Sequence, residues 1–361
     1  MSQHPKVAIM ILNHNGLRWL PRCFSSLTQT NYPNYEIYLL DNASIDGSSE
    51  YVTKNFPQVK VICFRENLGF AEAYSRVIEK VDADHILLLN NDTEILNSDW
   101  INSLVKTIGE PDVAAVTCKM VSMIDHSVLD SVGGMGIPFW RGFVDIGKCE
   151  VDTGQYDLVG SGPFSFCGGA ALISKSALRI VGGFDRKLFM YFEDVDLSWR
   201  FRLRGYRISY SPEARVAHFR RGSAERNTLD EFYFCHRNLL RTIIKNCGGS
   251  LKWALFNYLL YSSIMISSGS FITSRHSIPE KVLRGAIWNL RNFKDTYKQR
   301  LTIQANRRLQ DTEIIGAMFP NIPRYQPDSD WITRILNTIF ESSQRRKFER
   351  SRHVIKPKDN G

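Results

Sequence analysis

The chain has 361 residues, of which 43% are hydrophobic and 23% charged, the composition of an ordinary folded globular protein. This length allows one large domain with appendages, or two domains. The seven cysteines form no C-x-x-C pair and no zinc spacing, which argues against a disulfide scaffold or a zinc centre and predicts reduced thiols. No signal peptide precedes the first strand-like run, so we expect a cytoplasmic protein.

The net charge of +9 is unevenly distributed. From Arg275 to Gly361 the chain holds 18 Lys and Arg against 9 Asp and Glu, so this segment carries the whole excess and the first 274 residues are balanced. A basic segment behind a neutral domain predicts an acidic surface as its partner, either anionic lipid or nucleic acid. A solubilising tail is the alternative.

Apolar runs alternate with helical patterns over the first 95 residues. Residues 17–27 show helical spacing, with Pro21 as a kink or a late helix start, and two further helices are expected through about Lys54 and about Glu79. Strands that alternate with helices predict an α/β fold with a parallel, doubly wound sheet. The predicted strands are Val7–Leu12, Glu36–Leu40, Val59–Phe64 and the run from His85 to Leu89.

Two of these strands end in acidic residues, at Asp41 and at Asn90-Asn91-Asp92. Ligands of open α/β sheets sit beyond the carboxyl ends of the strands, where Asp92 and its neighbours suit Mg²⁺ or Mn²⁺ and a nucleoside diphosphate. The alternatives are that Asp92 caps a helix starting near Asn97 or Ser98, and that Asp41 only stabilises a turn. No G-x-G-x-x-G or P-loop follows the first strand, which argues against a dinucleotide-dependent dehydrogenase and an ordinary NTPase.

The middle of the chain is less regular. Val113–Cys118 predicts a strand, and residues 120–165 have weak periodicity, so we expect substrate-shaping loops there. After the apolar stretch from Cys167 to Ile173, Ser174 is suited to cap a short helix that ends at Gly182-Gly183.

Three carboxylates, Glu193, Asp194 and Asp196, directly follow an aromatic run. They are costly to bury without a purpose, although a helix N-terminus also favours anions. Tyr206–Tyr210 and Arg215–Ala217 predict closing strands, and His218 stands at the end of the last one. A neutral imidazole there can complete a metal site begun by Asp92, and the basic loop that follows suits phosphate.

The C-terminal part begins with a helical pattern that contains Arg237, Arg241 and Lys245. The next stretch, Trp253 to Phe271, has no charged residue and approaches the roughly 20 apolar residues of a membrane-spanning helix. Its asparagine and serines make it a poor span. We therefore favour an interfacial amphipathic segment beside the basic tail, with a plain packing helix as the alternative.

Taken together, the motifs resemble family 2 glycosyltransferases of the GT-A fold, specifically the bacterial rhamnosyltransferase-like branch. The resemblance covers roughly the first 225 residues in family order, and each motif alone is weak. The matching pieces are Val7 to Asn15, Asp41 to Gly47, Asn67 to Ala71, Leu87 to Glu94, Gly168 to Ala170, Gly183 to Asp185, Met190 to Arg200 and His218 to Ser223.

The resemblance implies a role for each matching residue. Asp194 is the catalytic base with Glu193 orienting it or touching the acceptor, and Asp92 and His218 hold the metal ion. One departure is that the family's D-x-D reads Asn90-Asn91-Asp92, which leaves one carboxylate. The nucleotide-binding residues implied are Asn13, Asp41, Asn67, Gly69 and Asn91, and the acceptor- or phosphate-binding residues are Trp199, Arg200 and Arg221. For Trp199 a core position, and for Arg200 a solvated surface position, are the alternatives.

These roles imply an inverting, metal-dependent glycosyltransferase of cell-surface polysaccharide synthesis. Its donor is a dTDP or UDP sugar, with rhamnose expected, and its acceptor is a saccharide or lipid-linked saccharide. We expect residues 1–225 to form the catalytic domain, with 1–95 binding the nucleotide and 96–225 the acceptor, 226–300 an amphipathic helical segment, and 301–361 a basic tail. An anionic membrane surface is an expected partner, at the inner face of the cytoplasmic membrane.

Two readings from other classes remain. One is a non-catalytic nucleotide-binding protein with a degenerate glycosyltransferase domain, against which the complete Glu193-Asp194 context argues. The other is a membrane or nucleic-acid adaptor. The basic tail lacks interleaved aromatic residues, so we expect no nucleic-acid partner.

Overall fold

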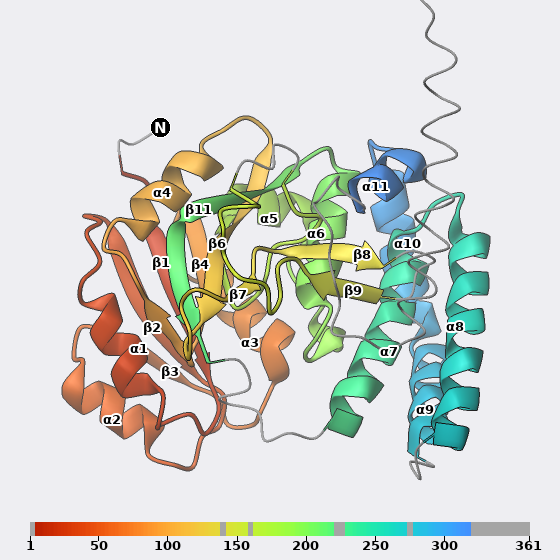
Figure 1. Ribbon diagram of the computed structural model, residues 1–361, viewed down its shortest axis with the longest axis horizontal. Coiled ribbons are helices and arrows are strands. Elements are labelled where there is room, and N and C mark those ends of the chain that lie inside the picture. Colours follow the sequence, from red (N-terminus) through yellow and green to blue (C-terminus); the bar gives the residue numbers. More distant parts are fainter. Residues whose placement is uncertain (1–3, 138–141, 158–161, 220–227, 273–276, 319–361) are drawn as a thin grey trace, which may run out of the picture. The chain divides into compact units, whose positions relative to one another are not determined.

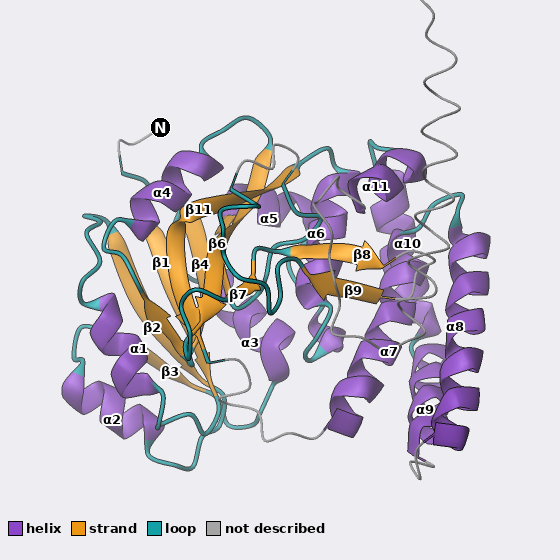
Figure 2. Ribbon diagram, viewed as in Figure 1, coloured by secondary structure: helices purple, strands orange, loops and turns teal. Residues whose placement is uncertain are grey.

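The computed structural model describes residues 4–137, 142–157, 162–219, 228–272 and 277–318. Strands run over β1 Val7–Asn13, β2 Tyr35–Asp41, β3 Lys60–Cys63, β4 His85–Asn90, β5 Thr93–Ile95, β6 Val113–Ser122, β7 Leu129–Ser131, β8 Gly134–Ile137, β9 Gly142–Asp145, β10 Ala170–Ser174 and β11 Arg207–His218. The main sheet has the order β3-β2-β1-β4-β10-β6-β11-β5, with β7 beside β6, and β8 pairs with β9 in a separate hairpin (Figures 1 and 2).

Helices cover both faces of this sheet and continue beyond it. Helix α6 follows a 3₁₀ turn at Arg186–Leu188. The helices are α1 Leu20–Leu27, α2 Ser48–Asn55, α3 Gly69–Ile78, α4 Trp100–Ile108, α5 Lys175–Val181, α6 Glu193–Leu203, α7 Thr228–Asn246, α8 Leu251–Ile272, α9 Ser277–Arg291, α10 Phe293–Ala305 and α11 Asp311–Met318.

The predicted parallel half of the sheet is confirmed. Strand β1 pairs in parallel with β2 and with β4, and β2 pairs in parallel with β3. Beyond them β10 runs antiparallel between β4 and β6, and β11 is parallel to β6. As a result the carboxyl ends of β1, β2, β4, β6 and β11 lie at one edge of the sheet, together with the start of β10.

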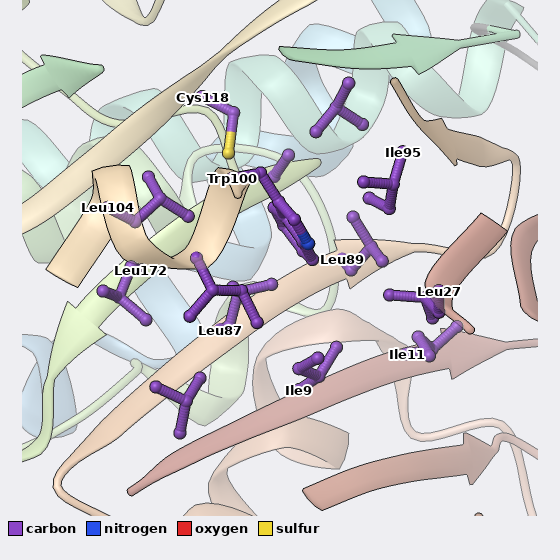
Figure 3. Packing of buried hydrophobic residues seen from close by; sticks show 14 of the residues in the cluster. Ile9, Ile11, Leu27, Leu87, Leu89, Ile95, Trp100, Leu104, Cys118 and Leu172 are labelled. Carbon is purple, nitrogen blue, oxygen red and sulfur yellow. The ribbon is translucent and has the colours of Figure 1, made fainter. Parts of the chain in front are cut away.

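Burial on both faces explains the uninterrupted apolar runs, because successive side chains of a strand point to opposite faces. Ile9 and Ile11 pack with residues of α1 and α4 such as Leu27 and Trp100 (Figure 3). The alternate residues of β1, including Met10, pack on the other face against α3, α5 and α6.

Several predicted helix ends are confirmed. Pro21 stands in the first turn of α1, so the helix starts late and is not kinked. The side chain of Ser174 accepts a hydrogen bond from the backbone N–H of Ala177 at 3.3 Å and caps α5. Gly182 then ends α5 in the left-handed conformation, with φ of 89°.

Three expectations need correction. Thr93–Ile95 forms β5, which pairs with β11, and α4 starts only at Trp100, so Asp92 is not a helix cap. The two closing strands are one strand, β11, whose register with β6 shifts between Ser211 and Arg215. Residues 120–165 contain the end of β6 and the strands β7, β8 and β9 rather than loops alone, because non-local pairing orders a stretch with weak periodicity.

Helices α7 to α11 belong to the same compact unit as the sheet, which spans Met1–Ile322. Trp199 of α6 packs with Leu239 and Ile243 of α7, Tyr258 of α8 and Ile314 of α11 in one apolar cluster. The predicted domain boundary at residue 225 lies outside the described residues. Of the helices described, none combines the length and apolar character needed to cross a membrane.

Candidate active site

Polar residues end the strands that meet at one edge of the sheet. Asn13 ends β1, Asp41 ends β2, Asn90 ends β4 and His218 ends β11. Asn13 pairs in register with Asp41, and Leu12 pairs with Asn90. This is the edge at which open α/β sheets bind their ligands.

Asn13 and Asn91 form a buried amide pair next to this edge. The Nδ2 of Asn91 donates to the Oδ1 of Asn13 at 2.7 Å, and the Nδ2 of Asn13 donates to the hydroxyl of Ser44 at 3.1 Å. Gly16 faces the pair so closely that a Cβ atom there would overlap both amides. The pair therefore shapes the turns after β1 and β4, and nucleotide contact by Asn13 and Asn91 remains a prediction.

Asp41 is buried and already engaged by the turn that follows β2. It accepts hydrogen bonds from the backbone N–H of Ser44 at 3.2 Å and from the hydroxyls of Ser44 and Ser49. Asp41 therefore stabilises this turn, which is the alternative role that the sequence left open for it. Base binding by Asp41 stays a prediction.

Asn67 and Gly69 connect the nucleotide side to the segment before α6. The Oδ1 of Asn67 accepts from the side chain of Asn42 at 2.8 Å and from the backbone N–H of Gly69 at 2.9 Å. Gly69 has φ of 72°, and a Cβ atom there would lie 2.5 Å from the backbone oxygen of Phe189. Only glycine suits this position, because both the backbone conformation and the contact exclude a side chain.

The predicted metal ligands lie together. The Nε2 of His218 is 3.2 Å from the Oδ1 of Asp92, and its Nδ1 is 2.7 Å from the Oδ2 of Asp130. Burial lowers the pKa of His218, but the hydrogen bonds with Asp130 and Asp92 outweigh burial and raise that pKa to about 9. His218 is thus held by two carboxylates, and metal binding there would have to displace its proton.

The side chains of Asp92 and His218 fit a divalent cation that also binds the substrate of the enzyme reaction. Asp92 supplies a carboxylate and His218 an imidazole, both of which suit Mn²⁺, whereas Mg²⁺ prefers oxygen alone. No group of three or more Asp, Glu, His or Cys able to hold a metal ion is found within the described ranges. The remaining coordination positions would fall to diphosphate oxygens and water, so the site is complete only with its nucleotide.

Asp130 is a residue that the sequence reasoning missed. It lies in β7, inside the stretch of weak periodicity, and no local pattern distinguishes it from the other acidic residues of that stretch. Its contact with Nδ1 orients the imidazole of His218 so that Nε2 faces Asp92.

The carboxylates Glu193 and Asp194 open α6. The Oδ2 of Asp194 accepts a hydrogen bond from the backbone N–H of Gly168 at 3.1 Å. Burial, followed by the charge of Asp145, raises the pKa of Asp194 to about 6 against the lowering effect of its backbone hydrogen bonds. Burial and the adjacent Asp194 raise the pKa of Glu193 well above its ordinary value. The roles of Asp194 as a base and of Glu193 as its partner remain predictions.

The segment before α6 is conformationally strained. Phe189, Tyr191 and Phe192 have φ of 60°, 66° and 71°, in the left-handed region that bulky side chains avoid. The Nδ2 of Asn238 on α7 lies 2.8, 2.9 and 2.7 Å from the backbone oxygens of Leu188, Met190 and Tyr191. One buried amide thus holds the backbone that positions Asp194.

Asn238 and its neighbour Arg237 were also missed from the sequence as site residues. Arg237 donates to the backbone oxygens of Lys187 and Leu188, at 3.2 and 2.8 Å. The available signal was a polar pair next to Leu239 in an otherwise apolar helical pattern. Local sequence did not reveal its partners, because they lie about 50 residues away.

Gly168 and Gly169 lie between Asp194 and the pair of Asp92 and His218 in a chain of hydrogen bonds. Asn90 donates its backbone N–H to the oxygen of Gly169 at 2.9 Å, and its side chain lies 3.4 Å from the Nε2 of His218. A Cβ atom on Gly169 would lie 2.9 Å from Met120 and 3.3 Å from the side chain of Asn90. Gly169 therefore permits the close packing against Met120 and Asn90, and hydrogen bonds through Gly168 and Gly169 connect Asp194 with Asn90.

Two residues predicted to contact acceptor or phosphate have other partners. Trp199 is 1% exposed and packs against Phe143 and Phe164, so the core alternative holds and its ring faces no sugar. Arg200 is buried, with Nη2 3.0 Å from Asp196 and Nη1 donating to the backbone oxygen of Val181 at 2.8 Å, so it is neither solvated nor directed at a phosphate. The predicted Arg221 lies outside the described residues.

Comparison with known proteins agrees with this geometry. The family described as Glycosyl transferase family 2 matches residues 8–178, which reach from β1 to β10 and include Asn13, Asp41 and Asn90 but neither Asp194 nor His218. The match assigns this region of the chain to a family of glycosyltransferases.

Two curated relatives are similar over longer stretches. The N-acetylglucosaminyl-diphospho-decaprenol L-rhamnosyltransferase of Mycobacterium tuberculosis is 26% identical over 284 residues, covering 71% of this chain and 91% of that protein. The O-antigen biosynthesis protein RfbC of Myxococcus xanthus is 24% identical over 235 residues, covering 63% of this chain but only 18% of that protein. These relatives support the rhamnosyltransferase-like branch of the family.

Solved structures show the same GT-A fold at low identity. A mannosyltransferase from Pyrobaculum calidifontis, in complex with GDP-Man and Mn²⁺, has a TM-score of 0.50 at 16% identity and covers 89% of each chain. GalNAc-T7 with UDP, GalNAc and Mn²⁺ has a TM-score of 0.54 at 18% identity, covering 70% of this chain and 50% of the other. TarS 1-349 of S. aureus with UDP-GlcNAc has a TM-score of 0.51 at 15% identity, covering 78% and 79%.

Proposed function

We propose that this protein is an inverting, metal-dependent glycosyltransferase that moves a sugar, rhamnose as the first candidate, from a dTDP or UDP donor to a lipid-linked saccharide. The reaction belongs to cell-surface polysaccharide synthesis and takes place at the inner face of the cytoplasmic membrane. The name of the Mycobacterium relative supports both the rhamnosyl donor and the diphospholipid acceptor, since this chain spans 91% of that protein.

One observation carries the proposal. The pair of Asp92 and His218 is linked to Asp194 through Asn90 and the backbone of Gly168-Gly169, at the ligand-binding edge of the sheet. A nitrogen-oxygen donor pair for a cation and a carboxylate poised near neutral pH are the two components that transfer from a nucleoside diphosphate requires.

The residues of this chain have distinct tasks in such a transfer. Asp194 accepts the proton of the acceptor hydroxyl as that oxygen attacks the anomeric carbon, and the bond to the diphosphate breaks on the opposite face. One displacement inverts the configuration at that carbon. Gly168 holds the carboxylate of Asp194, and Asp130 holds the imidazole of His218 toward Asp92. A bound Mn²⁺ or Mg²⁺ supplies stabilisation of the charge on the leaving diphosphate.

Metal binding and proton transfer are assigned to different residues, so the two roles can be tested separately. Thermal stabilisation of the purified protein is measured with dTDP, UDP and GDP, each with and without Mn²⁺. A metal-dependent shift with one nucleotide is expected, because a ligand that binds only the folded state raises its stability. His218→Ala should lose the metal dependence of that shift.

Asp194→Asn tests the base separately. We expect this variant to keep the nucleotide-induced shift and to lose about 10³-fold in turnover, within the range of general-base catalysis. Turnover comparable to that of the wild type would exclude Asp194 as the base. Absence of any nucleotide shift in the wild type would exclude the donor site.

A further inference from the structure

Large hydrophobic side chains are exposed mainly on the C-terminal helices. Among the described residues fifteen such side chains are exposed, and ten of them lie on α8, α9 and α10. On α8 they include Trp253 at 68% and Leu259 at 61% exposure, and on α9 Leu290 reaches 74%. Scattered exposed apolar residues are ordinary, but a concentration of this kind marks an interaction surface.

Six of these residues form one stripe, which we call the α9–α10 stripe. The two helices follow each other with a single residue between them, and the i to i−4 backbone hydrogen bonds continue across the junction, from Asn292 to Trp288 and from Thr296 to Asn292, each at 3.0 Å. The spacing of three or four residues places its members on one side of a nearly continuous helix. The stripe consists of Leu283, Ile287, Leu290, Phe293, Tyr297 and Leu301.

The opposite side of the same helices includes buried polar residues. Asn289 donates to the backbone oxygen of Arg237 at 2.9 Å, and Thr296 accepts from Arg241 at 2.5 Å. Arg300 donates to the backbone oxygen of Ile244 at 2.7 Å. Helices α9 and α10 therefore direct these polar groups, together with apolar residues such as Val282 and Trp288, inward, and they carry the apolar stripe on their outer side.

Basic residues accompany the stripe at regular positions. Arg284, Arg291, Lys294 and Lys298 each directly follow a stripe residue, and all four are exposed. On α8, the exposed Lys252 directly precedes Trp253. Of the acidic residues on these helices, Glu280 lies 3.5 Å from Arg284, and Asp295 is engaged by Arg241 at 2.6 Å. An apolar stripe flanked by bases is complementary to a bilayer with anionic headgroups.

We propose that the α9–α10 stripe, with the outer side of α8, is the surface that binds this enzyme to anionic phospholipid bilayers. The apolar residues enter the interface between headgroups and acyl chains, and the flanking bases contact the phosphates. This deepens the proposed function, because an acceptor attached to a lipid is presented at such a surface. The helices lie on the bilayer and do not cross it.

The test is co-sedimentation of the full-length protein with vesicles of phosphatidylglycerol and phosphatidylcholine, compared with phosphatidylcholine alone. Leu290→Glu and Leu301→Glu should each weaken binding to the anionic vesicles at least about tenfold, since each removes a buried leucine side chain from the interface. The triple substitution Arg291→Gln, Lys294→Gln, Lys298→Gln should weaken it about 100-fold, at roughly fivefold per base.

Ile180→Glu is the matched control, because Ile180 on α5 is 52% exposed and Leu301 is 55% exposed. It should leave vesicle binding unchanged. Every variant retains residues 319–361, so the differences report the helices and not the basic tail. The proposal is overturned if the stripe variants bind vesicles as tightly as the wild type does. It is also overturned if Ile180→Glu loses as much vesicle binding as the stripe variants lose. So would a protein dimer, seen by sedimentation velocity, that Leu290→Glu dissociates. The nucleotide-induced thermal shift is measured on the same samples, so a failed donor site is distinguished from a failed membrane surface.

Discussion

The parallel half of the sheet and the C-terminal helices distribute polarity in opposite ways. In β1 and β4 the interior is apolar throughout, and polar groups appear only where a strand ends, as at Asn13 and Asn90. In α7 charged and amide groups such as Arg241 and Asn238 are buried, while on α9 and α10 large apolar side chains face outward. The first region places polar residues at the ends of its strands. In the second region, Asn238 of α7 anchors the backbone that precedes α6.

The buried charges of α7 form a closed network with the catalytic half. Arg241 donates to both oxygens of Asp185 at 2.7 and 3.1 Å, and Lys245 lies 2.5 Å from Asp185 and 2.9 Å from Asp196. Arg241 and Lys245 are fully buried. Desolvation of such ions is costly, so the network adds specificity of packing more than stability. The network fixes α7 against the 3₁₀ turn and α6, at Asp185 and Asp196, which lie on either side of Asp194 in the sequence.

The largest expected effect comes from breaking this network. Asp185→Ala should lower the free energy of unfolding by about 3–5 kcal/mol, because it leaves Arg241 and Lys245 buried without their main counter-ion. Asp295→Ala is the control, since Asp295 contacts the same arginine but is 39% exposed on its side chain, and it should cost less than about 1 kcal/mol. Urea unfolding measures both, and equal losses would contradict the distinction.

The same network predicts how stability depends on pH. Burial raises the pKa of Asp185, but Lys245 and Arg241 outweigh burial and hold it below its ordinary value. A carboxyl with a depressed folded-state pKa stabilises the protein above its unfolded pKa of about 3.9 and loses that contribution as the pH falls further. Wild-type stability should therefore fall below about pH 4 more steeply than that of Asp185→Ala.

A smaller effect is expected from the amide that holds the strained segment. Asn238→Ala should lower kcat about 10- to 100-fold with little change in donor KM, because the backbone before Asp194 loses its anchor and Asn238 hydrogen-bonds to that backbone rather than to the residues predicted to bind nucleotide. Asn289→Ala is the matched control, since Asn289 is equally a buried helical amide that donates to backbone oxygens. It should reduce thermal stability without reducing kcat. A drop in stability alone for Asn238→Ala would make its role structural only.

The smallest effect concerns the acid side of the pH profile. With the pKa of Asp194 raised to about 6, kcat/KM should fall about tenfold per unit as the pH drops below that value, because the protonated carboxyl cannot accept a proton. The residual activity of Asp194→Asn should be flat over the same range. A wild-type profile that bends only near pH 4, the ordinary value for Asp, would contradict the influence of burial and Asp145.

The two regions also differ in how well the sequence predicted them. In the first 95 residues every predicted strand and helix is present, because each buried strand is a short apolar run with turn residues at its end. The stretch 120–165 was predicted poorly, since β7, β8 and β9 owe their existence to pairing with distant partners. Trp199 and Arg200 were predicted to contact ligand, with a core position as the alternative for Trp199. That alternative is confirmed, whereas the burial of Arg200 was not predicted from spacing within α6.

Local pattern determined the α/β fold, the ends of the parallel strands and the acidic residues that stand there, Asp41 and Asp92, whereas the roles predicted for Asp194 and His218 came from the resemblance to a family. The fold and the strand ends follow from sequence alone because apolar periodicity and turn residues act over a few positions. Only the tertiary structure decided that Asp130 orients His218, that Asn238 holds the segment before Asp194, and that α9 and α10 present their apolar side outward. Those features depend on contacts between residues about 50 to 90 positions apart, which no local pattern encodes.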